Sequence, residues 1–123
     1  MGERIFLGAT GALWLLYGLY CFGNPGALAD GAGVVFQTQT GSTELRAMYG
    51  GLQAAIGLLA LAGVVRADLT RPALLAMAFL TTGLASARLL GVLLDGGLSG
   101  YTVLGLLFEI SSAVLATRFL RRA

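Results

Sequence analysis

The chain has 123 residues, of which 57% are hydrophobic and 11% are charged, and its formal net charge is +2. This composition excludes an ordinary water-soluble domain, in which about a quarter of the residues are charged, and it predicts an integral membrane protein. The chain has no His and one Cys, so it lacks the ligand sets of zinc and haem sites, and we expect no metal and no cofactor.

Four apolar stretches, at about residues 4–23, 44–65, 71–94 and 100–120, are each long enough to cross a hydrocarbon core about 30 Å thick. We therefore predict one domain, residues 1–123, that folds as an all-α bundle of four transmembrane helices. The first stretch precedes an Ala-Leu-Ala sequence that resembles a signal cleavage site. Its apolar run is longer than a signal-peptide core, and we interpret it as a helix.

The predicted loop between the first two helices, residues 24–43, is long for so small a chain. It follows a strong helix stop, Gly23-Asn24-Pro25-Gly26, and contains the apolar patch Val34-Val35-Phe36. Such a loop is either functional or disordered. Here we expect either a partly helical cap over the bundle or a floppy loop, and the sequence leaves both open. The second helix is expected to start with Thr43 as its N-cap and Glu44 in its first turn, where the helix dipole favours negative charge.

The remaining connections are short. Residues 66–71 lead into Pro72, which is tolerated in the first turn of a helix, and residues 95–100 lead into the last helix. Consecutive helices are therefore antiparallel neighbours. Small residues recur at four-residue spacing on two helices, a pattern that allows close packing in lipid. These residues are Gly50 and Ala54 on the second helix, and Gly83, Ala87 and Gly91 on the third.

The arginines predict the orientation. One side of the bundle carries six arginines against two acidic residues, and the other carries Arg46 against Asp30, Glu44 and Asp95. The positive-inside rule then places both termini in the cytoplasm, in what we expect to be a bacterial inner membrane. We expect the arginines at the C-terminus to contact anionic lipid headgroups and not nucleic acid. The six arginines are Arg4, Arg66, Arg71, Arg118, Arg121 and Arg122.

Three polar residues, Gln53, Arg88 and Glu109, fall in one layer roughly 10 to 15 Å below the outer surface when positions are converted to depth with the helical rise. Tyr17 and Tyr49 come to a similar or shallower depth. Helical spacing places these residues on polar or small stripes. The stripes are Arg46, Tyr49, Gly50, Gln53 and Gly57 on the second helix, Thr81, Arg88 and Asp95 on the third, and Thr102, Gly105, Glu109, Ser112 and Ala116 on the fourth.

A charged side chain at the middle of a membrane helix costs about 2.5 to 3.5 kcal/mol when it faces lipid. Glu109 is the only acidic residue of the predicted membrane interior, and we therefore predict that it forms an ion pair with Arg88. Gln53 and a tyrosine hydroxyl are expected to add hydrogen bonds. Arg46 and Asp95 are expected to form a second pair at the mouth of an internal polar cavity.

The sequence also resembles a known family. The segment Ser-Thr-Glu-Leu-Arg-Ala-Met-Tyr-Gly-Gly-Leu-Gln at residues 42–53, the Arg-Leu-Leu-Gly before Asp-Gly-Gly, and the glutamate of the last helix resemble small bacterial four-helix membrane proteins grouped as a domain of unknown function. The resemblance implies hallmark positions but no activity. A more distant likeness, to the DoxX-like group and the sterol-isomerase and sigma-2-receptor group, is architectural. The hallmark positions are Glu44, Arg46, Tyr49, Gly50, Gly51, Arg88, Asp95 and Glu109.

The cavity predicts binding of a small amphipathic or anionic molecule or a lipid. Alternatives stay open: a purely structural polar network, an accessory subunit of a larger membrane complex or a homo-oligomer, or an intramembrane acid/base enzyme using Glu109. The chain shows no catalytic set of nucleophile and base, so we expect binding and assign no catalytic residue. The ligand-binding candidates are Tyr17, Arg46, Tyr49, Gln53, Arg88, Asp95 and Glu109.

Two other classes of four-helix membrane protein fit poorly. Small multidrug exporters carry their essential glutamate in the first helix, which here has no acidic residue beyond Glu3. Dual-topology fluoride channels lack the charge bias of this chain. Proton-coupled transport is a weaker alternative, because an acidic residue paired with an arginine stays ionised.

Overall fold

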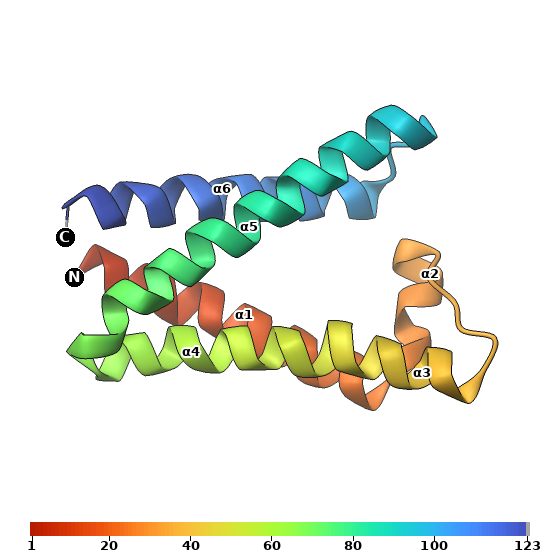
Figure 1. Ribbon diagram of the computed structural model, residues 1–123, viewed down its shortest axis with the longest axis horizontal. Helices are drawn as coiled ribbons and strands as arrows, with labels where there is room; N and C mark the ends of the chain where they lie inside the picture. Colours follow the sequence, from red (N-terminus) through yellow and green to blue (C-terminus); the bar gives the residue numbers. More distant parts are fainter. Residues whose placement is uncertain (123) are drawn as a thin grey trace.

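The computed structural model describes residues 1–122, and within these residues every regular element is helical (Figure 1). The last residue of the predicted domain, 123, lies outside the described part. Four helical rods are long and apolar enough to span a membrane. The predicted all-α four-helix membrane fold is therefore confirmed. The rods are α1 (Gly2–Gly23), the continuous run of α3 (Gln39–Leu45), η2 (Arg46–Leu52) and α4 (Gln53–Val65), then α5 (Ala67–Asp95) and α6 (Gly100–Arg122).

The second rod starts earlier than predicted. Its N-cap is Thr38, whose hydroxyl oxygen accepts a hydrogen bond from the Gly41 amide at 3.1 Å, which satisfies one of the free amides of a helix start. The predicted N-cap, Thr43, is wrong: its hydroxyl donates to the carbonyl of Gln39 inside the helix. Glu44 consequently lies beyond the first turn, and the helix-dipole role proposed for it is not available.

The segment before this rod is partly helical, as in the first of the two alternatives for the predicted loop. A short 3₁₀ turn, η1 (Pro25–Ala27), leads into α2 (Leu28–Ala32), which ends at Gly33 with a positive φ of 71°. Leu28 is buried and packs with Cys21 and Leu45 in a small apolar cluster. This contact attaches the cap to α1 and α3.

The rods associate as two antiparallel pairs, α1 with α4 and α5 with α6 (Figure 1). The start of α1, the end of α6 at Arg122 and the turn from α4 to α5 lie at one end, which we call the terminal end (Figure 1). The α2 segment and the turn from α5 to α6 lie at the other, the loop end. Helix α5 is near α4 at the terminal end and diverges from it towards the loop end (Figure 1). This divergence leaves space between the two helix pairs on the loop side of the core.

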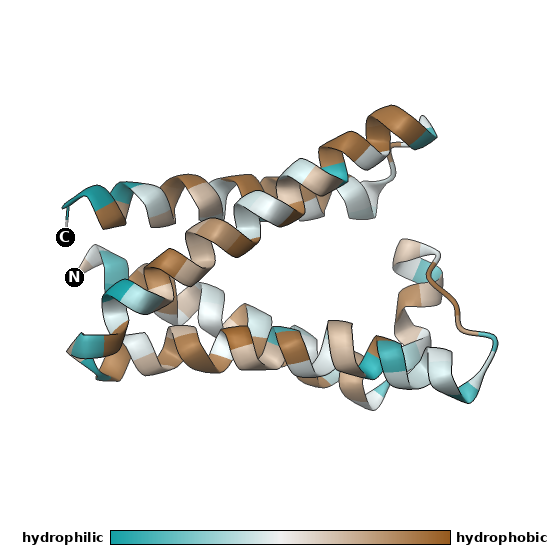
Figure 2. Ribbon diagram, viewed as in Figure 1, coloured by the Kyte–Doolittle hydropathy of each residue, from teal (hydrophilic) through white to brown (hydrophobic). Residues whose placement is uncertain are grey.

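The buried apolar core fills the terminal half of the bundle. Leu7, Leu74, Met77 and Ala116 are at most 1% exposed and belong to one cluster. Apolar side chains also cover much of the outside, and hydrophilic residues gather at the helix ends and turns (Figure 2). A bundle that is apolar within and without is a multi-pass membrane protein.

Glycines bring α1 and α4 into backbone contact. A Cβ atom added at Gly18 would lie 2.5 Å from the backbone nitrogen of Ala54, and one added at Gly57 would collide with the backbone nitrogen of Leu15. The packing role predicted for Gly50 and Ala54 is therefore confirmed. The role predicted for Gly83 and Gly91 is not realised within residues 1–122, because a Cβ at either would meet no other atom within 4 Å.

Candidate functional site

A cavity of about 850 Å³ lies between the two helix pairs. Most of its walls are apolar, which is typical of sites that bind small molecules. All four rods contribute to it, because α5 and α6 separate from α1 and α4 beyond the core. The lining residues that the argument uses are Trp14 and Tyr17 of α1, Tyr49 of η2, Gln53 of α4, Arg88 of α5, and Tyr101, Gly105 and Glu109 of α6.

The predicted ion pair between Arg88 and Glu109 is confirmed. Arg88 Nη2 donates to Glu109 Oε1 at 2.6 Å, and Arg88 Nε donates to Oε2 at 3.0 Å and to Oε1 at 3.2 Å. This side-on, two-nitrogen arrangement is the strong form of the arginine–carboxylate interaction. The Glu109 side chain is 5% exposed and the Arg88 side chain 28%, so the carboxylate is buried behind the guanidinium.

Two residues of α6 form the seat of the guanidinium. A Cβ atom at Gly105 would lie 3.1 Å from Arg88 Cζ and Nε, so the absence of a side chain there lets the guanidinium lie against α6. The ring of Tyr101 lies 6.0 Å from Arg88 Cζ, within range of a cation–π interaction. The Tyr101 hydroxyl in turn shares a 3.0 Å hydrogen bond with that of Tyr17. A chain of contacts therefore links α5, α6 and α1.

The guanidinium keeps unused donors. Arginine has five N–H groups, and the contacts to Glu109 occupy Nε and one hydrogen of Nη2. The other three have no acceptor among residues 1–122, although Arg88 lines the cavity. The indole nitrogen of Trp14, another lining residue, is also buried without a partner in the described chain. The unpaired groups at the ion pair itself are therefore donors, whereas Gln53 and Tyr49 on the other walls can both donate and accept.

Tyr49 and Gln53 line the cavity, as predicted, but do not join the ion pair. Within the described residues neither side chain hydrogen-bonds to Arg88 or Glu109. The hydrogen bonds expected from Gln53 and from a tyrosine hydroxyl are therefore a wrong prediction. The reason is the divergence of α5 from α4, which places the ion pair and Gln53 on different walls of the cavity.

The expected pair between Arg46 and Asp95 is also wrong. Arg46 Nη1 donates to the carbonyl oxygen of Phe22, and its guanidinium lies 5.6 Å from the Phe22 ring centroid. Asp95 is exposed at the end of α5 and forms no ion pair within residues 1–122. Neither residue lines the cavity.

The π-helical form of η2 explains why the predicted stripe divides here. Its turns close by i→i+5 hydrogen bonds and take about one residue more than an α turn, so side chains three apart no longer share a face. Arg46 and Gly50 both meet Phe22 of α1, whereas Tyr49 and Gln53 reach the cavity. The stripe was predicted with α-helical spacing, which fails across this segment.

Trp14 and Tyr101 line the cavity but are not among the ligand-binding candidates predicted from the sequence. Tyr101, Gly105 and Glu109 are each four residues apart, so the spacing contained the signal. The stripe predicted on the last helix began at Thr102, one residue after Tyr101. The Thr102 side chain is not part of the cavity wall, and its hydroxyl contacts the Ser99 hydroxyl at 3.1 Å.

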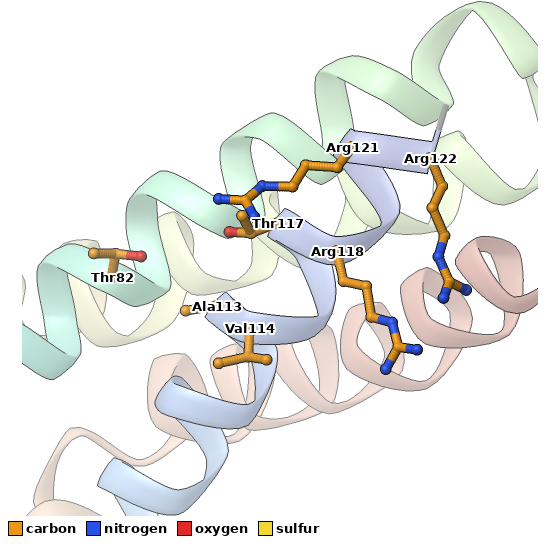
Figure 3. A pocket seen from close by; sticks show the side chains of 7 residues that line it. All are labelled: Thr82, Ala113, Val114, Thr117, Arg118, Arg121 and Arg122. Atoms are coloured by element: carbon orange, nitrogen blue, oxygen red, sulfur yellow. The ribbon is translucent and has the colours of Figure 1, made fainter.

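A second, more open pocket of about 620 Å³ lies at the terminal end, on α5 and α6 (Figure 3). Arg121 lies alongside Thr117, while Arg118 and Arg122 extend to the other side of α6 (Figure 3). The three cations therefore do not converge on one point, unlike the two charged groups of the cavity. Contact of these arginines with lipid headgroups stays a prediction.

The chain belongs to the DUF4345 family, a domain of unknown function, whose family profile matches residues 2–120. The match confirms the resemblance to a family without an assigned activity, and it spans all four rods. No curated protein and no solved structure matches the chain.

Proposed function

We propose that this member of the DUF4345 family binds a small amphipathic molecule in the cavity, with the polar head at Arg88 and the tail along the apolar walls. The volume of about 850 Å³ falls within the range of about 300 to 1,000 Å³ found for small-molecule sites. The observation that carries the proposal is a guanidinium that lines an apolar cavity and has three N–H groups without an acceptor in the described part of the chain. A purely structural ion pair has no need of these open donors.

The ligand is proposed to enter from the bilayer. Leu84 on α5 and Leu52 on η2 line the cavity and are 39% and 47% exposed, so apolar side chains lie on both sides of the divergence between α5 and the second rod. An acyl or isoprenoid chain can pass such a surface without leaving a hydrocarbon environment.

The proposed site lies in the extracytoplasmic half of a bacterial inner membrane, with both termini in the cytoplasm. Support comes from the six arginines of the predicted cytoplasmic ends, which belong to the start of α1, the α4 to α5 connection and the end of α6. Reporter fusions test this orientation. Fluorescent protein fused to either terminus should be bright, and a fusion after Gly96 to alkaline phosphatase should be active. The opposite pattern would overturn the orientation.

Assembly into a larger complex is the second candidate. Its support is Gly83 and Gly91 on α5, whose surfaces have no neighbour within 4 Å in the described chain and could receive another helix. Cysteine crosslinking at Ala87 in native membranes tests it, because a specific interface gives one crosslinked product that a cysteine at exposed Val65 does not give. An enzymatic role for Glu109 has less support, because Arg88 engages both of its carboxylate oxygens.

Native mass spectrometry of the protein in mild detergent tests the binding function. We expect a co-purified molecule of lipid-like mass in the wild type, and its loss in Arg88→Met and Gly105→Ala, because the second substitution displaces the guanidinium from its seat. Gly91→Ala is the matched control, since its methyl group meets no neighbour, and should retain the molecule. Equal retention in Arg88→Met, or no binding by the wild type after incubation with a total lipid extract, would refute the proposal.

A further inference from the structure

The charge of the cavity restricts the head group of its ligand. Among residues 1–122, the only charged residues that line it are Arg88 and Glu109, and their interacting atoms approach to 2.6 Å. The site is therefore electrically neutral before any ligand arrives. An anionic head at the free N–H groups of Arg88 would be attracted by the guanidinium and repelled by the carboxylate behind it, so the repulsion offsets part of the attraction.

An anion would also lose its hydration without gaining a counter-charge. Burying an uncompensated ion in a medium of low polarity costs several kcal/mol, even after the surroundings relax. Arg46, the nearest further cation along the second rod, does not line the cavity and hydrogen-bonds to the Phe22 carbonyl. No second arginine among residues 1–122 is therefore placed to hold a negatively charged head in this cavity.

The unpaired hydrogen-bond donors at the ion pair determine which kind of neutral head group fits. At the ion pair, Arg88 offers three free N–H groups, whereas the carboxylate of Glu109 is buried and both of its oxygens already accept from Arg88. Gln53 and Tyr49, on the opposite wall, can donate or accept and so favour neither kind of head. A ligand that supplies acceptors satisfies these donors, and one that supplies only donors leaves them unpaired. Carbonyl oxygens of esters and ketones are acceptors only. The remaining wall is mostly apolar and suits a hydrocarbon tail.

Resting on the proposed function, we infer that the cavity selects an uncharged long-chain lipid whose head is an ester or ketone carbonyl, in preference to a lipid with a negatively charged head. The carbonyl oxygen accepts from the free N–H groups of Arg88 while Glu109 keeps the guanidinium neutralised. Glu109 is thereby a specificity-determining residue, because it decides which charge the head carries.

The fluorescence of Trp14 can be used to measure binding in the cavity. It is the only tryptophan of the chain, and it lines the cavity beside Phe108, at 5.9 Å between ring centroids. A brominated chain bound in the cavity will quench its fluorescence. Three probes of one dibrominated alkyl chain are titrated into the protein in unbrominated detergent: the methyl ester, the alkyl sulfate and the hydrocarbon without a head. Binding to a site gives saturable quenching, and partition into the micelle gives only a linear decrease.

For the wild type we expect saturation by the ester at a concentration at least about tenfold lower than by the sulfate or the hydrocarbon. In Glu109→Gln the amide oxygen can still accept from Arg88, but the guanidinium charge is no longer balanced. We therefore expect the order to reverse, so that the sulfate binds at least as tightly as the ester. Gly91→Ala, with an unchanged cavity, should follow the wild type.

The outcomes separate this inference from the proposed function. Tighter binding of the sulfate, or equal binding of the ester and the hydrocarbon, by the wild type overturns the inference and leaves a binding cavity in place. Absence of saturable quenching by all three probes overturns the proposed function itself. If Glu109→Gln does not fold, the order of ester and sulfate in the wild type decides alone. A folded Glu109→Gln protein that keeps the wild-type order overturns the role of Glu109.

Discussion

The two helix pairs of this bundle are held together by different means. Between α1 and α4, glycines remove the side chains and the backbones touch, as at Gly18 and Ala54. Between α5 and α6, the ion pair of Arg88 and Glu109 spans the space, and Gly105 serves to receive the guanidinium. Close packing in lipid depends on van der Waals contact and leaves no room for a ligand. The polar link instead lies at the wall of the cavity.

Breaking the polar link should have the largest effect on stability. Arg88→Met leaves the buried carboxylate of Glu109 without its partner, and loss of one member of such a pair costs about 3 kcal/mol or more. The double variant Arg88→Met with Glu109→Leu should recover most of this loss, because no unpaired charge remains. Reversible unfolding in detergent measures both. A double variant no more stable than Arg88→Met would contradict this account of the α5 and α6 pair.

Breaking the backbone contact should have a smaller effect. Gly57→Ala puts a methyl group against the backbone of Leu15, and overpacking of this kind costs about 1 to 3 kcal/mol. Gly83→Ala is the matched control in α5: it has no neighbour within 4 Å and gains helix propensity of up to about 1 kcal/mol. In thermal unfolding in detergent, the midpoint should therefore fall for Gly57→Ala and rise for Gly83→Ala. Equal midpoints for the two variants would contradict the stabilising role of glycine in the packing of α1 against α4.

The hydrogen bond that links the two pairs beside the cavity gives the smallest expected effect, because the shared core also joins the pairs. Tyr17→Phe removes the hydrogen bond of α1 to Tyr101 of α6, and side-chain hydrogen bonds between membrane helices contribute about 0.6 kcal/mol on average. Tyr20→Phe, at an exposed position of the same helix, should change the unfolding free energy by less. A loss of several kcal/mol in Tyr17→Phe would mean that this bond, and not the packing within the pairs, joins the bundle.

The membrane fold and the central ion pair were predictable from the sequence, because both follow from the free-energy cost of placing a charged side chain in lipid. Only one acidic residue lies in the interior, so Arg88 has one candidate partner. The mouth pair of Arg46 and Asp95 was not predictable in the same way, because both residues lie near helix ends, where other partners are available. Its failure depends on the divergence of α5 and on the π-helical geometry of η2, neither of which helical periodicity contains.

The role of Trp14 also needed the structure. An aromatic side chain near the middle of a helix packs in a core or faces a cavity according to how far the opposite helix lies, and sequence spacing gives only its face. Trp14 does both, since it belongs to the buried core cluster and lines the cavity.

The π-helical segment Arg46–Leu52 makes chain length matter as much as residue identity. Because its wider turns accommodate about one extra residue, deleting one residue from it would allow ordinary α-helical bonding to resume while the parts of the rod before and after it keep nearly the same orientation. A family member with a single-residue gap at this point would therefore differ mainly within this segment, which contacts Phe22 on one side and lines the cavity on the other.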